Sequence, residues 1–444
     1  MLRFDVRENE KGRFHLTNFG VAVGGVDGMQ QFDLHVLDCS DQTLVVLPAI
    51  TACDLGISAS GEHYRSNCYF VTDFVKRDRN KIITSEHKRV STLLSRSYFR
   101  SNICSMSGYV PGEQPQDDGF IKLNTNENPY PPSPAVAIAI NEALQRGLQK
   151  YPDPLAGVFR RRASELLGVP PEWILAGNGS DDILTIVTRA LVGEGQLLRL
   201  PYPSYILYRT LAELQGARSE EIHFQPDWSL PEAFGQGGDD LRLVFLPNPN
   251  SPSGTIVSPQ AVLELAERLP CPLLVDEAYV DFAESNCLDL VAKNEKIMVS
   301  RTLSKSYALA GLRFGYLVAQ PHLIEQFVKV KDSYNCDALS IAAATAAIGD
   351  RAWLDQTRER ILHTRGRLLT ALRNLGFIVP DSQANFVWAL HSRQAVRPMY
   401  EELKRWRILV RYMEYPSWGD GLRITVGRDK EIETCVERLR EIIA

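Results

Sequence analysis

Short apolar runs alternate with helical stretches over the middle of the chain. Four clear runs lie at 241–246, 271–282, 296–300 and 313–319, separated by stretches in which apolar residues recur at helical spacing. Continuous apolar runs of this length suit strands that are covered on both faces, as in a mostly parallel sheet. This part of the chain therefore predicts an α/β domain.

The last hundred residues have a different rhythm. Residues 351–376 predict one long amphipathic helix that ends at Gly376. Three strand-like segments and a closing helix follow it, at 386–390, 407–412, 422–427 and 429–444. The pattern is typical of an α+β domain attached to the α/β domain.

Residues 1–105 follow neither pattern, and a fresh start appears at Met106. The stretch 76–100 is locally basic. We expect residues 1–105 to be an N-terminal extension, either poorly ordered or not part of the native protein with Met106 as the initiator. A DNA-binding or targeting module is the remaining alternative, although the acidic residues near Met1 argue against an organelle transit peptide.

The composition is that of an ordinary soluble globular protein. Of 444 residues, 44% are hydrophobic and 23% are charged, and the net charge is −5. This balance gives no support for a nucleic-acid partner, and no apolar run approaches the 18 residues of a membrane span. Eight cysteines without a CxxC pair and eight histidines without an HxxxH pair predict free thiols in a reducing cytoplasm and no metal site.

Candidate chemistry centres on Lys305, in the stretch "SRTLSKSYALAGLRFGYLVA". A free lysine has a pKa of about 10.4 and is a poor nucleophile, but burial near other cations lets it form a Schiff base. Pyridoxal phosphate needs such a lysine. It also needs an acid at its pyridine nitrogen, a donor near O3′, a stacking aromatic and a phosphate cup. Thr302, Ser304 and Arg313 flank the lysine and could contribute to that cup.

Two further segments supply an acid and a phosphate turn. Asp276 ends the apolar run of "LLVDEAYVDF" and could pair with a pyridine nitrogen, with Tyr279 in reach of O3′; a helix cap or a surface acid is the alternative for Asp276. In "GNGSDD" the backbone N–H groups of Gly179, Ser180 and Asp181 would point at a phosphate. The same residues are also typical of an ordinary turn and helix N-cap. The segment is not a GxGxxG dinucleotide fingerprint.

An aromatic and an amide complete the set. Tyr205 of "PYPSY" could stack on a ring or be a buried aromatic at a helix start, and Asn250 of "PNPNSPSG" could bind O3′. Each of these parts follows an apolar strand, and ligands of open α/β sheets bind at such carboxyl ends.

From Met106 to Ala444 the chain resembles the fold-type I pyridoxal-phosphate aminotransferases, most closely those that act on histidinol phosphate. The motifs that carry the resemblance are "KLNTNENPYPPSP", "KYPDP", "GNGSDD", "PYPSY", "PNPNSPSG", "VDEAY", "SRTLSKSYALAGLRFGY", "SQANFVWAL" and "ILVRY…GDGLRITVG". The resemblance implies an α/β large domain with a mostly parallel sheet at 146–340. It also implies a smaller α+β domain from 106–145 and 341–444.

The resemblance also implies a role for each site residue. Lys305 binds the cofactor and carries the proton of the 1,3-shift. The remaining cofactor residues are Asp276 for the pyridine nitrogen, Tyr279 and Asn250 for O3′, Tyr205 for stacking, and Gly179, Ser180, Asp181, Thr302, Ser304 and Arg313 for the phosphate. Tyr151 reaches the phosphate of a partner subunit, which implies a homodimer with shared sites. Arg411, Arg423, Asn385 and Asn128 line the substrate site.

The substrates implied are histidinol phosphate and glutamate or 2-oxoglutarate, in cytoplasmic histidine biosynthesis. One departure is Ser251, which stands where the family more often has a second asparagine, and it leaves the O3′ contact open. Three alternatives stay open: an aromatic amino acid aminotransferase, a decarboxylase of the threonine-phosphate type, and a transcription regulator with an aminotransferase-like sensor. The last would need a helix-turn-helix in residues 1–105, which we do not find.

Overall fold

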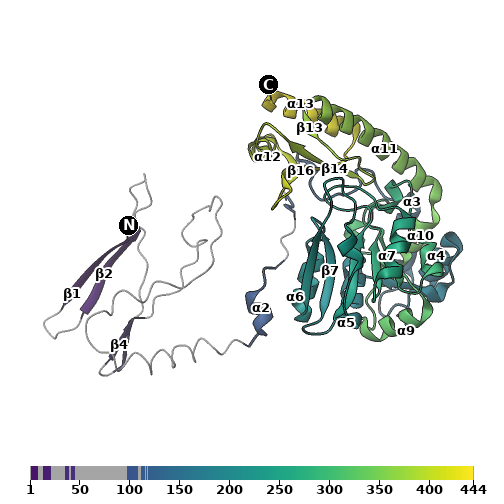
Figure 1. Cartoon of the computed structure of the whole chain (residues 1–444), viewed down its shortest axis with the longest axis horizontal. Coiled ribbons are helices and arrows are strands. Elements are labelled where there is room, and N and C mark those ends of the chain that lie inside the picture. Colours follow the sequence, from purple (N-terminus) through teal and green to yellow (C-terminus); the bar gives the residue numbers. More distant parts are fainter. Residues whose placement is uncertain are drawn as a thin grey trace. The chain divides into compact units, whose positions relative to one another are not determined.

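The computed structural model describes the backbone of residues 2–8, 14–21, 36–39 and 42–45 and, with side chains, residues 98–108, 112–115, 117 and 119–443. The chain divides into two units, Met1–Arg96 and Ser97–Ala444 (Figure 1). In the first unit, β1 (Leu2–Glu8) pairs antiparallel with β2 (Phe14–Val21), and β3 (Val36–Cys39) pairs antiparallel with β4 (Gln42–Val45). The hydropathy pattern did not predict these hairpins. The end of the extension that was predicted to be poorly ordered or not native is described in the second unit. There Ser101–Ser105 form the short helix α2, and Asn102 Nδ2 donates to the backbone oxygen of Glu213 at 2.7 Å. The rest of that prediction lies outside the described residues.

The second unit is built on a seven-stranded sheet with the order β6-β12-β11-β10-β9-β7-β8. Its strands are β6 (Ile174–Gly177), β7 (Leu197–Tyr202), β8 (Arg218–His223), β9 (Leu241–Pro247), β10 (Leu273–Asp276), β11 (Ile297–Thr302) and β12 (Gly315–Val318). Strands β7 to β11 run parallel, and β12 is antiparallel to both of its neighbours. The predicted mostly parallel sheet is confirmed.

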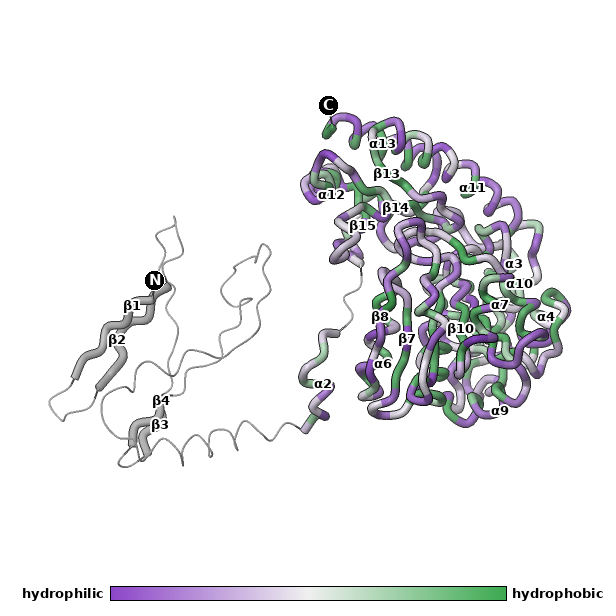
Figure 2. Tube along the Cα trace, viewed as in Figure 1, coloured by the Kyte–Doolittle hydropathy of each residue, from purple (hydrophilic) through white to green (hydrophobic). Residues whose placement is uncertain are grey.

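Both faces of this sheet are covered by helices, which explains the continuous apolar runs. In β10, Leu273 and Val275 pack in one apolar cluster, while Leu274 packs in another on the opposite face. Figure 2 shows apolar residues concentrated in these strands and hydrophilic residues along the helices. The helices around the sheet are α4 (Gly157–Leu167), α5 (Ser180–Leu191), α6 (Leu207–Gln215), α7 (Pro259–Arg268), α8 (Leu290–Lys293), α9 (Pro321–Val330) and α10 (Ala338–Gly349).

A second, five-stranded sheet has the order β13-β14-β16-β15-β5. Its strands are β5 (Ile121–Leu123), β13 (Phe377–Ile378), β14 (Phe386–His391), β15 (Ile408–Tyr415) and β16 (Gly419–Thr425). They pack with α11 (Arg351–Asn374), α12 (Val396–Arg405) and α13 (Asp429–Ile443) around a separate apolar cluster. The structure confirms the predicted α+β character of this part. Strand β5 comes from the N-terminal arm and pairs in parallel with β15.

The arm continues into α3 (Pro134–Gln145), which Ser133 caps by accepting a hydrogen bond from the amide of Ala135. The predicted boundary between domains, at residues 340 and 341, falls inside α10. Ile341, Ala344 and Ile348 of that helix pack in the same apolar cluster as the large sheet. The division into two domains at that residue therefore stays a prediction.

Candidate active site

The loops that carry the candidate chemistry meet at one edge of the large sheet. Asp276 at the end of β10 lies opposite Pro247 of β9 and Ser300 of β11. Thr302 at the end of β11 lies opposite Gly315, and Gly315 lies opposite Gly177. Strand register therefore brings the turn after β6, the asparagine loop after β9, the acid of β10 and the lysine loop after β11 side by side.

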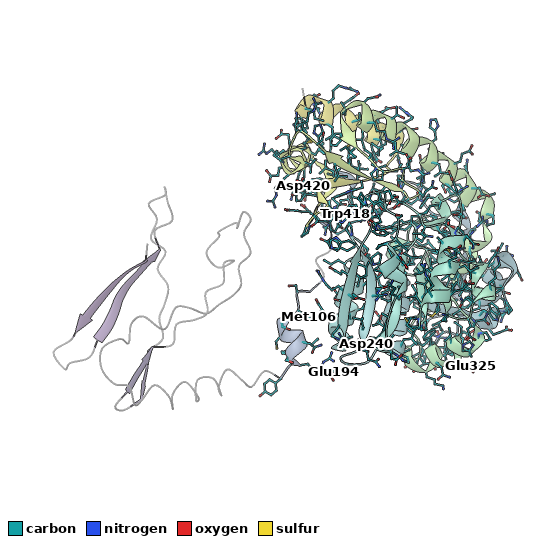
Figure 3. The ribbon with its side chains drawn as sticks, in the orientation of Figure 1. Met106, Glu194, Asp240, Glu325, Trp418 and Asp420 are labelled. Carbon is teal, nitrogen blue, oxygen red and sulfur yellow. The ribbon has the colours of Figure 1, made fainter. Side chains whose placement is uncertain are left out.

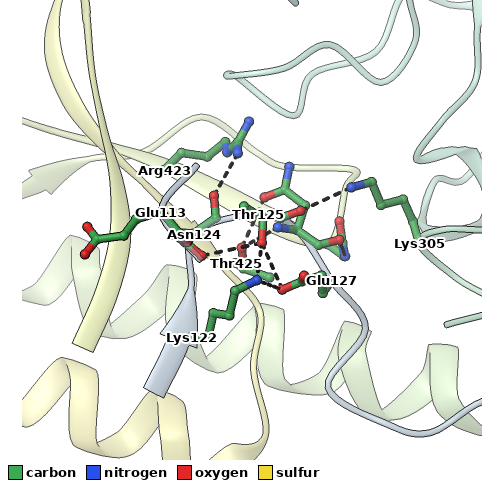
Figure 4. Close-up of polar contacts among 10 residues, drawn as sticks. Glu113, Lys122, Asn124, Thr125, Glu127, Lys305, Arg423 and Thr425 are labelled. Atoms are coloured by element: carbon green, nitrogen blue, oxygen red, sulfur yellow. Dashed lines mark hydrogen bonds and ion pairs between the residues drawn. The ribbon is translucent and has the colours of Figure 1, made fainter. Parts of the chain in front are cut away.

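Lys305 lies in the loop after β11 and points at the N-terminal arm (Figure 4). Its Nζ donates a hydrogen bond to the backbone oxygen of Thr125 at 3.2 Å, and it lies 5.7 Å from the ring centroid of Tyr279. Burial, followed by the guanidinium of Arg423, lowers the pKa of Lys305 to about 8. A lysine with this pKa is partly neutral near physiological pH and can act as a nucleophile.

Asp276 is buried and accepts a hydrogen bond on each carboxylate oxygen. Tyr208 Oη donates to Oδ2 at 2.7 Å, and Ser300 Oγ donates to Oδ1 at 3.0 Å. Burial raises the pKa of Asp276 to about 6, while the two hydroxyl donors act in the opposite direction. The sequence prediction missed Tyr208 and Ser300. The position of Tyr208, one helical turn beyond Tyr205, was the available signal for the first.

An anion-binding arrangement lies between the lysine loop and the start of α5. Arg313 Nη1 donates to Ser304 Oγ at 3.2 Å, and Thr302 Oγ1 donates to the same oxygen at 3.0 Å. No side chain caps α5, whose N-cap is Gly179 with φ +90°. A Cβ at Gly179 would lie 2.6 Å from Arg313 Nη2. The hydroxyls, the guanidinium and the open helix end form a donor set that suits a phosphate.

The candidate stacking tyrosine lies beside this donor set. Tyr205 Oη donates to Asp181 Oδ1 at 3.5 Å, and the Tyr205 ring meets that of Tyr208 edge to face at 5.6 Å between centroids. Arg313 Nη2 lies 3.4 Å from the other carboxylate oxygen of Asp181. Asp181 therefore links the aromatic to the phosphate donors.

Two residues were predicted for O3′ of the cofactor. Asn250 is buried; its Nδ2 donates to Ser253 Oγ at 2.9 Å, and its Oδ1 has no partner among the described residues. The Oη of Tyr279 accepts a hydrogen bond from Asn126 Nδ2 at 3.0 Å. Burial raises the pKa of Tyr279, so its phenol keeps its proton near neutral pH and can donate it in a hydrogen bond.

The N-terminal arm contributes Asn126 to the site in addition to Asn128. Asn128 Nδ2 donates to the backbone oxygen of Ser306 at 2.9 Å and its Oδ1 accepts from the amide of Tyr130, so the side chain braces the loop that holds Lys305. Asn385 Nδ2 donates to the backbone oxygen of Asn126 at 3.0 Å. The sequence prediction named Asn128 and Asn385 and missed Asn126, which lies in the same motif.

Lys122 and Glu127 form an ion pair within the N-terminal arm. Lys122 Nζ donates to Thr125 Oγ1 at 2.6 Å and forms an ion pair with Glu127 (Figure 4). Hydrogen bonds from Lys122 and Thr125 lower the pKa of the Glu127 carboxyl, although burial acts in the opposite direction. These contacts fix the carbonyl of Thr125, to which Lys305 binds.

Arg423 of β16 reaches the site from the second sheet. Its Nη1 donates to Ser251 Oγ at 3.0 Å and its Nη2 donates to the backbone oxygen of Asn124 at 3.1 Å, while its Nε is buried without a partner among the described residues. Arg411 lies directly opposite Arg423 in the pairing of β15 with β16. Ser251, which departs from the more common family residue, therefore accepts a hydrogen bond from Arg423 in this structure.

Tyr151 lies apart from these residues, on the surface. It is 80% exposed and stacks on Tyr334 with 4.4 Å between ring centroids. Leu148, Leu155 and Val158 are exposed close to it in the sequence. Such a group of exposed apolar side chains is typical of a surface that another molecule covers.

The residues at the sheet edge fit pyridoxal phosphate. A lysine with a lowered pKa, a buried carboxylate, a buried protonated phenol that can donate to O3′ and an oxyanion donor set are the groups that this cofactor requires. The described part of the chain contains no group of three or more His, Cys, Asp or Glu side chains that could hold a metal ion. None of the described helices is long and apolar enough to cross a membrane.

Comparison with known proteins agrees with this chemistry. The family model for class I and II aminotransferases matches residues 118–439. The histidinol-phosphate aminotransferase of Rhodopirellula baltica is 59% identical over 339 residues, which are 76% of this chain and 94% of that protein. Histidinol-phosphate aminotransferase 1 of Trichormus variabilis is 46% identical over 348 residues, 78% of this chain and 99% of that protein.

A solved structure gives the same result. The crystal structure of histidinol-phosphate aminotransferase from Sinorhizobium meliloti in complex with pyridoxal-5'-phosphate matches with a TM-score of 0.71 at 25% sequence identity. The match covers 79% of this chain and 99% of that one.

Proposed function

The chain belongs to the class I and II aminotransferases, and within them to the histidinol-phosphate aminotransferases, and from this premise we propose which of its residues carry the reaction. The enzyme uses pyridoxal phosphate and transfers the amino group between L-histidinol phosphate and 2-oxoglutarate, a step of histidine biosynthesis. The single observation that carries the residue assignment is the meeting of Lys305, Asp276 and the Arg313 donor set at one edge of one sheet.

Lys305 is the proposed catalytic residue. When bound, pyridoxal phosphate supplies an electron sink for the carbanion at the substrate's amino-bearing carbon. Lys305 Nζ would hold the cofactor in the resting enzyme and, once free, would carry the proton that leaves the amino-bearing carbon of the substrate. Its lowered pKa supports both roles because a neutral amine is required for each.

The other cofactor residues would hold pyridoxal phosphate and orient its ring. Asp276 faces the ring nitrogen, Tyr279 and Asn250 bind O3′, and Tyr205 stacks on the ring. The phosphate is held by the hydroxyls of Thr302 and Ser304, by Arg313, and by the backbone N–H groups of Gly179, Ser180 and Asp181. The contacts among Thr302, Ser304 and Arg313 support this assignment because they bring the donors together before a ligand binds.

Arg423 and Arg411 are the proposed anchors for the anionic end of the substrate. They lie directly opposite each other on neighbouring antiparallel strands, so their side chains share one face of the sheet. Like charges in this position destabilise a sheet, and a bound anion offsets the cost. Arg423 keeps its Nε and one Nη2 hydrogen for a ligand, which suits bidentate binding of a phosphate or a carboxylate. Asn385 and the arm residues Asn126 and Asn128 line the same substrate site.

We also propose a homodimer in the cytoplasm. The exposed stack of Tyr151 on Tyr334 supports a subunit interface through which Tyr151 reaches the partner's phosphate site. The described cysteines are free, which suits a reducing compartment: Cys104, Cys271, Cys287, Cys336 and Cys435.

The test is a profile of amino donors on the purified enzyme with 2-oxoglutarate as acceptor. We expect histidinol phosphate to give a higher kcat/KM than phenylalanine or tyrosine. A preference for the aromatic amino acids would assign the chain to that activity instead. Release of carbon dioxide from a phosphorylated amino acid without transamination would indicate a decarboxylase.

A further inference from the structure

The carboxylate of Asp276 lies between two buried hydroxyl groups. Tyr208 Oη donates to Oδ2 at 2.7 Å and Ser300 Oγ donates to Oδ1 at 3.0 Å. The side chains of Tyr208 and Ser300 are both 0% exposed. Each carboxylate oxygen thus has one hydroxyl donor and keeps further lone-pair capacity for a ligand.

The two donors come from different elements, and each is fixed by packing that does not involve the carboxylate. Ser300 is the direct neighbour of Asp276 in the parallel pairing of β10 with β11, so the register of the sheet places its hydroxyl. Tyr208 lies on α6, and its ring packs against Phe245 with 4.8 Å between centroids. The sheet register and the ring packing therefore place both hydroxyl oxygens beside the carboxylate before any ligand binds.

The donors have an electrostatic consequence for the buried acid. Burial alone favours the neutral form of a carboxyl, and burial raises the pKa of Asp276 to about 6 even with both donors in place. Burial, followed by the nearby Asp276, raises the pKa of Tyr208 well above its usual value, so the phenol stays protonated and remains a donor. Removing either donor would raise the pKa of Asp276 further and favour its neutral form.

We propose that Tyr208 and Ser300 are positioning residues that hold Asp276 ionised and aimed at the ring nitrogen of pyridoxal phosphate. The inference rests on the proposed function, since it takes that cofactor and that role of Asp276 as given. Tyr208 and Ser300 touch neither cofactor nor substrate in this account. They act through the carboxylate, which in turn keeps the ring nitrogen protonated.

The test compares two cofactors in Tyr208→Phe. The phenylalanine keeps the ring that packs on Phe245 and removes only the hydroxyl. The binding constants of pyridoxal phosphate and of its 1-deaza analogue, in which carbon replaces the ring nitrogen, are measured in wild type and variant. We expect the preference for pyridoxal phosphate over the analogue to fall about tenfold to a hundredfold, the range for a lost hydrogen bond to a charged group. The ¹⁵N chemical shift of the bound ring nitrogen should move toward the unprotonated value. Equal losses for both cofactors with an unchanged ¹⁵N shift would overturn the proposal.

Two further variants complete the experiment. Ser300→Ala removes the other donor and carries the same test if Tyr208→Phe does not fold. Tyr316→Phe is the matched control, because Tyr316 is also buried in this sheet but its hydroxyl interacts with Arg301 rather than Asp276. We expect no change of cofactor preference in Tyr316→Phe, and an equal change there would count against the proposal. If wild type fails to attach pyridoxal phosphate at Lys305, the proposed function fails instead, and peptide mapping after borohydride reduction detects that outcome separately.

Discussion

The two halves of the active site are built in opposite ways. On the cofactor side, Asp276 and Thr302 end adjacent strands of one sheet, and the acid already has its hydrogen-bond partners. On the anion side, Arg423 meets Asn124, which lies 299 residues earlier in the chain. Arg423 Nε and Asn385 Oδ1 are buried there without partners among the described residues. The acid on the cofactor side is therefore preorganised by its hydrogen bonds. The anion side, like Asn250 Oδ1 near the cofactor, keeps buried polar atoms for a ligand.

The largest expected effect tests the cofactor side. Asp276→Ala should retain some cofactor through the phosphate donors but lower kcat about a hundredfold to a thousandfold, because the variant lacks the charge that stabilises the protonated ring. Steady-state kinetics and the absorbance of bound cofactor measure the two properties. Survival of half the wild-type kcat would mean that Asp276 does not serve the ring nitrogen.

A smaller effect, confined to one substrate, tests the anion side. Arg411→Ala should lower kcat/KM for histidinol phosphate about tenfold to a hundredfold, the range for one charge-assisted hydrogen bond. The loss with an aromatic amino acid as donor should be smaller, since a carboxylate carries less charge than a phosphate. Equal losses for both donors would remove Arg411 from phosphate recognition. Arg373→Ala is a suitable control, because Arg373 pairs with Asp381 on the surface.

The smallest expected effect tests whether the charge of Arg423 on the anion side lowers the pKa of Lys305 on the cofactor side. The rate at which Lys305 attaches added cofactor should rise about tenfold per pH unit and level off above about pH 8, because only the neutral amine reacts. The positive charge of Arg423 is the second cause of the lowered pKa of Lys305, after burial. Arg423→Gln should therefore move the plateau to higher pH and slow attachment at pH 7 by less than about tenfold.

Arg411→Ala is the matched variant for this pH experiment. It removes a charge from the same hairpin, but Arg411 is not among the causes of the lowered pKa of Lys305. An unchanged plateau in Arg423→Gln, or the same shift in both variants, would contradict the coupling.

The same contrast explains what the sequence could predict. Lys305, Asp276, Asn250 and the turn at Gly179 each follow an apolar strand, and the strand ends of a parallel sheet meet at one edge, so local patterns locate them. The contacts of Asn126 and Ser251 could not be predicted in this way. Their partners, Tyr279 and Arg423, lie far away in the sequence, and no local pattern reports such pairs.

The sequence prediction also missed Tyr208 and Ser300, the two buried hydroxyl donors to Asp276. Tyr208 has the spacing of an ordinary buried helix residue, and Ser300 has that of an ordinary strand residue. Only the packing of α6 on the sheet and the register of β10 with β11 turn their hydroxyls toward Asp276. The aromatic contact between Trp228 and Trp418, at 4.3 Å between ring centroids, is a similar case. The contact joins the loop after β8 to the turn between β15 and β16. Figure 3 labels Trp418 in that turn.

The parallel pairing of β5 with β15 sets an order of events during synthesis of the chain. Residues 121–123 leave the ribosome nearly three hundred residues before their partner strand, residues 408–410. The large sheet between them uses closer partners and can form first, since domains generally fold as they are made. Closing a loop of nearly three hundred residues is slow compared with local pairing. The carbonyl that binds Lys305 and the one that binds Arg423 both follow β5 directly, so the catalytic site is completed only after residues 408–410 have been synthesised.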